Sequence, residues 1–309
     1  MKEKIIYAVV VTYNRKKLLK ENIVSFKNQV YKNFKLLIID NNSTDNTYEY
    51  IKDELTSDIE YINTKKNLGG AGGFSFGIQS AVQRGADYVW IMDDDTIPEK
   101  ETLEELVKTT DLLNGEFGFL ASKVLWKDME QICLMNKQAI SDDWIYNLNY
   151  LPYELIKVKV TSFVSCFINR KAIMDVGLPI TEFFIYGDDV EYTTRISNKY
   201  QSFLVNKSVV IHKIENNVSI HISQVDKSRI FRYKYMYRNG VYIAKKKGIK
   251  EFFKTNLRAI KAIGTVIKKS KDSKIKRIST IVSGIISGWT FNPKINYVEK
   301  RIENETKKN

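Results

Sequence analysis

Three adjacent aspartates, Asp93, Asp94 and Asp95, follow a short apolar run that is typical of a buried strand. Neighbouring carboxylates repel one another, and a bound cation would offset that repulsion. Carboxylate oxygens are the ligands that hard divalent cations prefer, and two acids spaced i, i+2 can point at one ion. The pattern therefore predicts a metal site at Asp93 and Asp95. The alternative is a helix cap, in which Asp95 or Thr96 begins a helix near residue 98.

A second acidic pair, Asp188 and Asp189, lies in the stretch FFIYGDDVEYTTR at 183–195. A carboxylate beside a hydrophobic wall can have a raised pKa and act as a general base. The alternative is again helix capping, with Asp188 or Asp189 as the N-cap and Glu191 in the first turn. Both interpretations remain open at this point.

The chain contains two histidines and two cysteines. His212 follows the apolar run at 209–211 and could complete the metal site, although a lone histidine at a strand end is more often structural. Cys133 and Cys166 fit neither a disulfide framework nor a zinc spacing, so we expect them to be core residues in a reducing compartment.

Glycines are concentrated in the stretch NLGGAGGFSFG at 67–77. Glycine allows the backbone to approach a ligand closely, and a glycine-rich loop before a helix can hold a phosphate. We therefore predict a loop followed by a helix at 73–84. A dinucleotide fingerprint would follow the first strand rather than the third, which argues against a nicotinamide enzyme. The alternative is a flexible loop without a ligand.

Strands and helices alternate over the first 115 residues. Strands are predicted at 5–11, 34–39, 59–62 and 88–92, and helices at 16–28, from 46, at 73–84 and at 98–113. This order predicts a parallel sheet with helices on both faces. Ligands bind at the carboxyl ends of such strands. Polar clusters follow all four strands, at 12–15, 40–42, 67–70 and 93–95, which indicates one site.

The middle of the chain is predicted to continue the same domain. Strands are expected at 117–124, 158–168 and 203–211, and helices at 170–176 and 189–199. We therefore predict one catalytic domain at 1–226, followed by a helical region at 227–309.

The net charge of +13 is concentrated in the region 227–309, which has 23 Lys and Arg against 5 Asp and Glu. Residues 1–226 have 26 basic and 31 acidic residues. Within the basic region, apolar residues recur at steps of three and four positions. They are Leu257, Ile260, Ile263, Ile267, Ile275, Ile278, Val282, Ile285 and Trp289. This pattern is typical of basic amphipathic helices.

Three interpretations of these helices are open: docking on an anionic membrane, packing on the catalytic domain, and oligomerisation. A nucleic-acid binder is disfavoured, because the acidic clusters of the body would repel phosphates in the absence of metal. The N-terminal run is predicted to be a first strand rather than a signal peptide, and no apolar run is long enough to predict a transmembrane helix.

Taken together and in order, six stretches resemble the inverting nucleotide-sugar glycosyltransferases of family 2. They are VVVTYNR (9–15), IIDNNSTDNT (38–47), NLGGAGGF (67–74), WIMDDD (90–95), GDDVEY (187–192) and RYKYMYRN (232–239). The resemblance implies the GT-A fold, an α/β domain with a Rossmann-like mixed sheet flanked by helices. Within the family, the chain looks most like bacterial galactofuranosyltransferases and rhamnosyltransferases.

The resemblance implies a role for each matching residue. The residues implied to bind the nucleotide-sugar are Thr12, Asn14, Arg15, Asp40, Asn67, Gly69, Gly70, Gly72, Gly73, Asp93 and Asp94. The residues implied to bind Mn²⁺ or Mg²⁺ are Asp93, Asp95 and His212. Asp189 is implied to be the catalytic base, with Asp188 beside it at the acceptor.

The implied reaction is the transfer of galactofuranose from UDP-galactofuranose to a hydroxyl of a lipid-linked or cell-surface glycan. The alternative donor is dTDP-rhamnose, used in polysaccharide synthesis. Either enzyme is expected in the bacterial cytoplasm, on the inner face of the membrane. Galactofuranose-specific members often have Trp before the paired acids, whereas this chain has Gly187. That difference leaves the donor sugar open.

Overall fold

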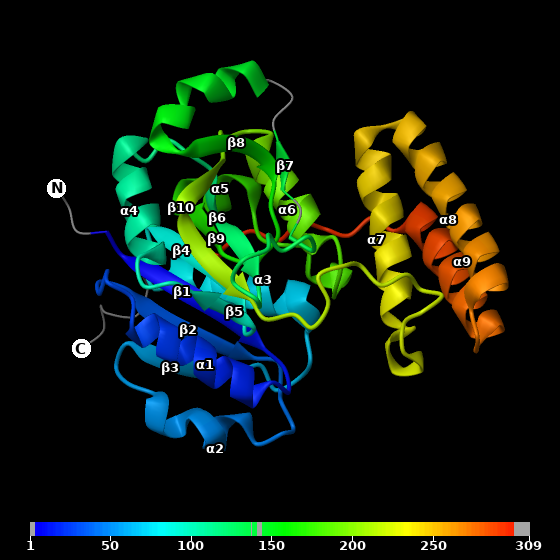
Figure 1. Cartoon of the computed structure of the whole chain (residues 1–309), viewed down its shortest axis with the longest axis horizontal. Helices are drawn as coiled ribbons and strands as arrows, with labels where there is room; N and C mark the ends of the chain where they lie inside the picture. The colour runs from blue at the N-terminus through cyan, green and yellow to red at the C-terminus, as the bar shows by residue number, and fades with distance from the viewer. Residues whose placement is uncertain (1–3, 137, 141–143, 300–309) are drawn as a thin grey trace, which may run out of the picture.

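The computed structural model describes residues 4–136, 138–140 and 144–299. Within these residues, ten strands form one mixed sheet, helices cover both of its faces, and three further helices form a separate group at one side (Figure 1). The strands are β1 (Ile6–Thr12), β2 (Lys35–Asp40), β3 (Ile59–Asn63), β4 (Tyr88–Asp93), β5 (Thr96–Pro98), β6 (Phe119–Trp126), β7 (Ala139–Ile140), β8 (Leu155–Val160), β9 (Cys166–Asn169) and β10 (Phe203–His212).

The α-helices are α1 (Lys16–Lys27), α2 (Thr47–Ile51), α3 (Gly69–Gln83), α4 (Thr102–Leu112), α5 (Arg170–Val176), α6 (Asp188–Ser197), α7 (Arg232–Lys247), α8 (Ile249–Lys269) and α9 (Lys274–Thr290). Short 3₁₀ helices are η1 (Lys52–Glu54), η2 (Trp144–Asn149), η3 (Leu151–Tyr153), η4 (Thr181–Phe183) and η5 (Lys227–Arg229). Among the residues described, no helix combines the length and the apolar character that crossing a bilayer requires.

The first half of the sheet has the predicted parallel arrangement. Its strands lie in the order β3-β2-β1-β4, and each pair is parallel. Because their carboxyl ends share one edge, the four predicted polar clusters meet there. The helices predicted at 16–28 and from residue 46 are confirmed as α1 and α2.

Both faces of this sheet are buried, which explains the continuous apolar run of β1. Tyr7, Val9 and Val11 face the cluster that α3, α5 and α6 complete. The alternate residues of β1 face a second cluster, which contains Leu19 and Phe26 of α1. The sheet is therefore the middle layer of three.

The second half of the sheet is mixed. β9 lies between β4 and β6 and is antiparallel to both, whereas β10 is parallel to β6. The prediction of a single strand at 158–168 was wrong, because β8 ends at Val160 and β9 begins at Cys166. The break between them includes Ser165, whose φ is 62°. Mixed pairing is the arrangement that the family resemblance implied.

The helix predicted at 98–113 begins later, because residues 96–98 form β5, which pairs antiparallel with β10. α4 begins at Thr102, and its N-cap is Glu101. The alternative in which Asp95 or Thr96 caps this helix is therefore wrong. The pairing aligns His212 with Thr96, so the end of β10 lies beside the triple aspartate.

β10 contains an irregularity of pairing before it reaches His212. Val205 pairs with Ser122 of β6, and Val209 pairs with the next residue of that strand, Lys123. The register therefore shifts between Val205 and Val209. Such bulges change the direction in which the following side chains point.

The glycine-rich segment is helical, and the prediction of a loop there was wrong. α3 begins at Gly69, so Gly70, Gly72 and Gly73 belong to its first turns. A Cβ on Gly73 would lie 2.6 Å from Val11 Cγ1, inside van der Waals contact. These glycines therefore allow α3 to pack closely on the sheet, a requirement that competes with their usual preference for loops.

We expect Gly77→Ala to lower the free energy of unfolding by about 1–3 kcal/mol, because the added methyl group overpacks the interface between α3 and the sheet. Its Cβ would lie 2.3 Å from Val9 Cγ1 and 3.0 Å from Ile39 Cγ1. Urea unfolding followed by circular dichroism measures the change. The matched control is Gly264→Ala in α8, where nothing lies within 4 Å of the new Cβ. That change should stabilise the protein by about 0.5–1 kcal/mol. Equal stability of the two variants would contradict this packing.

The basic region is helical, as predicted, and forms α7, α8 and α9, which lie together at one side of the sheet domain (Figure 1). They share a hydrophobic cluster that also includes Ile222 and Val225 of the preceding segment. The buried guanidinium of Arg277 donates to the carbonyls of both residues. Residues 300–309 of the predicted region lie outside the described residues, and the boundary at 226/227 stays a prediction.

The apolar residues predicted to form one stripe separate into two sets. Ile285 is buried and Ile263 packs into the helical cluster. The second set is exposed to solvent. Ile249, Phe253 and Ile286, which the predicted stripe did not include, are exposed as well. On α8 the exposed stripe comprises Ile249, Phe253, Leu257, Ile260 and Ile267.

Candidate active site

A candidate metal site lies where β4 and β10 end. Asp93 and Asp95 come from the end of β4, His212 is the last residue of β10, and their ligand atoms lie within 4.8 Å of one another. The backbone N–H of Lys213 donates to the carbonyl of Asp95 at 2.9 Å, which holds the two segments together. The predicted ligands are therefore brought together.

The chemistry of the donor set fits a divalent cation. Asp95 Oδ1 is buried and, among the described residues, accepts no hydrogen bond. His212 Nε2 lies 3.2 Å from that oxygen. A buried carboxylate oxygen without a hydrogen bond is costly, and a cation held by the two acids and the imidazole would remove the cost.

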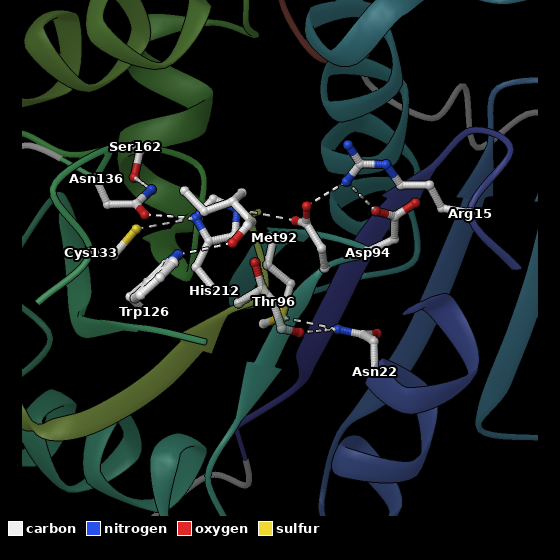
Figure 2. Close-up of polar contacts among 12 residues, drawn as sticks. Arg15, Asn22, Met92, Asp94, Thr96, Trp126, Cys133, Asn136, Ser162 and His212 are labelled. Carbon is white, nitrogen blue, oxygen red and sulfur yellow. Dashed lines mark hydrogen bonds and ion pairs between the residues drawn. The ribbon is translucent and has the colours of Figure 1, made fainter. Parts of the chain in front are cut away.

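Contacts on the far side of the imidazole orient His212 for such a role (Figure 2). His212 Nδ1 lies 2.7 Å from Asn136 Oδ1, and Asn136 Nδ2 donates to Ser162 Oγ at 2.8 Å. Cys133 Sγ lies 3.7 Å from the same ring nitrogen. Because Nδ1–H donates to the amide oxygen, the lone pair of neutral His212 is at Nε2, on the side of the acids. Sequence reasoning missed Asn136, which lies in an irregular segment.

On the other side of the acids lies Arg15, the N-cap of α1 (Figure 2). Thr12, the last residue of β1, also contacts the acids. Arg15 forms an ion pair with Asp95, and its guanidinium lies 3.4 Å from Asp94. Thr12 Oγ1 donates to Asp94 Oδ2 at 2.7 Å. The middle acid is therefore held by β1, while its neighbours face His212.

Burial and mutual repulsion dominate the electrostatics of the cluster. They raise the pKa of Asp93 to about 7, and burial likewise raises the pKa of Asp94 to about 7. Burial alone would also raise the pKa of Asp95, but His212 and Arg15 outweigh it and lower that pKa. Burial opposes protonation of His212, yet Asp95 raises its pKa to about 9. Two cationic groups thus face three acids.

The second predicted acid pair opens α6. Asp188 and Asp189 follow Gly187, whose φ is +81°, and Asp189 Oδ1 accepts from the N–H of Val190 at 2.8 Å. The N-cap is Gly187, so the interpretation in which Asp188 or Asp189 caps the helix is wrong, and both acids lie in the first turn instead. Burial raises the pKa of Asp189 to about 6. Burial, Asp189 and the charge of Asp93 raise the pKa of Asp188.

The loop that carries this pair packs between α3 and α7. The N–H of Ala71 donates to the carbonyl of Phe184 at 3.2 Å. A Cβ on Gly69 would lie 2.2 Å from that carbonyl oxygen, which explains why glycine is required there. The ring of Phe184 stacks on Tyr235 of α7, with centroids 5.0 Å apart. The glycine motif thus supports the acid pair directly.

The remaining predicted residues have structural partners. Asn14 Oδ1 accepts from the N–H of Thr44 at 2.7 Å, and Asn67 Oδ1 accepts from the N–H of Gly69 at 2.8 Å. Asp40 is buried and its two oxygens accept from Ser43, Tyr61 and Asn63. Binding a nucleoside at Asp40 would therefore require the exchange of one of these bonds.

Residues 7–120 match the family described as glycosyl transferase family 2. Galactofuranosyltransferase GlfT1 of Mycobacterium tuberculosis is 34% identical over 198 residues, which cover 62% of this chain and 64% of that protein. The protein of the same name from Mycolicibacterium smegmatis is 24% identical over 208 residues, covering 62% and 65%. The matching region is thus slightly less than two thirds of either relative.

Over residues 7–120 the chain is therefore similar to the glycosyltransferases of family 2. Its fold is GT-A, as shown by likeness to the mannosyltransferase PcManGT from Pyrobaculum calidifontis, solved in complex with GDP-Man and Mn²⁺. That likeness has a TM-score of 0.55 at 14% identity and covers 92% of this chain and 87% of that one. The resemblance seen in the six sequence stretches is confirmed at the level of family and fold.

For this candidate metal site we expect Asp95→Ala to weaken Mn²⁺ binding by at least about tenfold, because it removes one of the proposed ligands. Electron paramagnetic resonance of free Mn²⁺ during a titration measures the affinity. Asp58→Ala, which removes an exposed carboxylate, is the control and should bind as the unaltered protein does. Equal affinity of the two variants would exclude this site.

Proposed function

We propose that the protein is a metal-dependent, inverting glycosyltransferase that transfers galactofuranose from UDP-galactofuranose to a hydroxyl of a lipid-linked or cell-surface glycan. The observation that carries the proposal is the cluster of Asp93, Asp95 and His212, whose ligand atoms lie within 4.8 Å of one another. The names of the mycobacterial relatives support galactofuranose as the sugar.

Asp93, Asp95 and His212 would hold Mn²⁺ or Mg²⁺. The cation, when bound, supplies positive charge that stabilises the diphosphate as it leaves. Arg15 would add to this stabilisation, since nearly half of its side chain is exposed although it pairs with two acids. Asp94, tied to Thr12, would face the donor sugar or ribose.

Asp189 would take the proton from the acceptor hydroxyl while the hydroxyl oxygen attacks the anomeric carbon of the donor sugar. A single displacement inverts the configuration and needs one base. With its pKa raised to about 6, Asp189 is ionised at neutral pH yet is more basic than an ordinary aspartate. Asp188 would lie beside the acceptor.

A rhamnosyltransferase that uses dTDP-rhamnose is the second candidate, because Gly187 departs from the pattern of the galactofuranose-specific members. A Cβ at this position would lie 3.1 Å from Ile243 Cδ1, and the backbone φ of +81° disfavours any other residue. The tryptophan that often precedes the acids in galactofuranose-specific members therefore does not fit here without rearrangement of α7.

We expect Asp189→Asn to lower turnover by about 100-fold or more, because general-base catalysis is lost. UDP release from UDP-galactofuranose is measured with Mn²⁺ and an octyl galactofuranoside, and dTDP-rhamnose is run in parallel. In the unaltered enzyme, turnover should rise with pH through about 6, because the base must be deprotonated. The control is Asp53→Asn, a change at an exposed position. Glu191→Gln is unsuitable because it would break the ion pair between Glu191 and Arg195.

Near-normal turnover of Asp189→Asn would exclude Asp189 as the base. A thermal shift with Mn²⁺ and dTDP-rhamnose, but not with UDP-galactofuranose, would favour the second candidate. No turnover with any UDP-, dTDP- or GDP-sugar would exclude both.

We propose that the exposed stripe of α8 docks on the anionic inner face of the cell membrane, where a lipid-linked acceptor would be found. Apolar residues at 249, 253, 257, 260 and 267 share one side of the helix, and the exposed Lys250, Lys254, Lys261 and Lys268 flank them. Interfacial helices have this arrangement, and each lysine near an anionic surface contributes about 1 kcal/mol.

We expect the double change Phe253→Ser, Leu257→Ser to abolish co-sedimentation with phosphatidylglycerol-containing vesicles, because it removes the centre of the stripe. Val24→Ser, at an exposed position of α1, should sediment as the unaltered protein does. Equal sedimentation of both variants would contradict the proposal. Concentration-dependent self-association lost only in the double variant, without vesicle binding, would assign the stripe to a homo-oligomer instead.

A further inference from the structure

Asn239, in the middle of α7, is completely buried against the loop that carries the acid pair. Its Nδ2 lies 3.0 Å from the carbonyl oxygen of Phe183, 3.1 Å from that of Ile185 and 2.8 Å from that of Tyr186. The Nε of Arg238 donates to Asn239 Oδ1 at 3.0 Å, which fixes the orientation of the amide. One side chain thus binds three carbonyls that lie immediately before the acids.

These carbonyls need such a partner because the loop backbone is irregular. Phe184, Tyr186 and Gly187 have φ values of 62°, 68° and 81°. Positive φ is unfavourable for an aromatic residue and persists only where the surroundings enforce it. Turning the chain in this way directs the carbonyls of Phe183, Ile185 and Tyr186 toward Asn239, and that of Phe183 also accepts from the N–H of Ile185 at 2.7 Å.

We propose that Asn239 is a positioning residue for catalysis: it holds loop 183–187 in the conformation that presents Asp188 and Asp189 to the acceptor. This inference rests on the proposed role of Asp189. It makes α7 part of the active site, although α7 belongs to the basic helical region rather than to the sheet domain.

The side chain that this position requires is specific. Two N–H donors must face the carbonyls while an oxygen accepts from Arg238, and the amide of asparagine offers both on a short stem. Aspartate would present acceptors to acceptors. A further bond from Arg238 to the carbonyl of Glu182 supports the start of the same loop.

The test compares Asn239→Ala with Asn256→Ala, a matched change in α8 that removes an amide bonded to Phe252 and Trp289. Steady-state turnover of UDP-galactofuranose with an octyl galactofuranoside is measured, together with the affinity for UDP in Mn²⁺. Asn239→Ala should lower kcat by about 100-fold, because misplacing a reacting group by an ångström has effects of this size. Affinity for UDP should change by less than about twofold, because only acceptor-side geometry is altered.

Hydrogen exchange provides a readout that does not depend on turnover. Amides in a peptide spanning 181–191 should exchange faster in Asn239→Ala than in Asn256→Ala, with the metal-site peptides unchanged. If Asn239→Ala does not fold, Arg238→Ala is measured instead, since it removes the bonds to Asn239 and Glu182. It should show the same change in exchange and a smaller loss of kcat.

Turnover and exchange equal to those of Asn256→Ala would overturn the inference, as would a uniform rise in exchange across the whole domain. The result for Asp189→Asn distinguishes a wrong positioning role of Asn239 from a wrong proposed function. If Asp189→Asn is inactive while Asn239→Ala is active, the positioning role is wrong and the base assignment stands. If Asp189→Asn is active, the base assignment itself is wrong.

Discussion

Three carboxylates lie side by side at the end of β4, and their mutual repulsion in a buried place is the constraint around which the domain is arranged. Arg15 approaches from β1 and His212 from β10, so two distant parts of the chain supply the balancing charge. The hydrogen bond from His212 to Asn136 holds the imidazole in its orientation. A protein that only needed to be stable would not bury Asp94 and Asp95 beside a third acid, because apolar side chains would fill the same volume at lower cost.

The sequence was most informative where a physical rule links local pattern to position. Parallel strands end at one edge, so the clusters at 12–15, 40–42 and 93–95 could be placed together from the order of the strands alone. The helices α7, α8 and α9 were also predictable, because apolar residues recur at helical spacing. The pattern could not show which apolar residues face solvent. Ile285 turns inward and Ile286 outward, and this depends on where α9 packs against α7.

The sequence was least informative where one residue type serves competing purposes. Glycines at 69–73 were predicted to form a loop, yet they are helical because α3 must pack closely against Val11 and the loop at Phe184. Asn136 and Asn239 were missed because a single buried amide leaves no periodic signal. Their partners are 76 and up to 56 positions away in sequence. Such residues are defined by the tertiary structure alone.

The register shift in β10 has a consequence for how relatives of this protein are compared. His212 points toward the acids because of the number of residues between Val205 and Val209, where the paired position on β6 advances by only one residue. An insertion or deletion of a single residue there would leave every ligand present in an alignment and yet reverse the side of the strand from which the imidazole emerges. The presence of matching ligand residues in an alignment is therefore a weak criterion for metal binding among proteins of this fold. The number of residues between Val205 and Val209 is a better criterion.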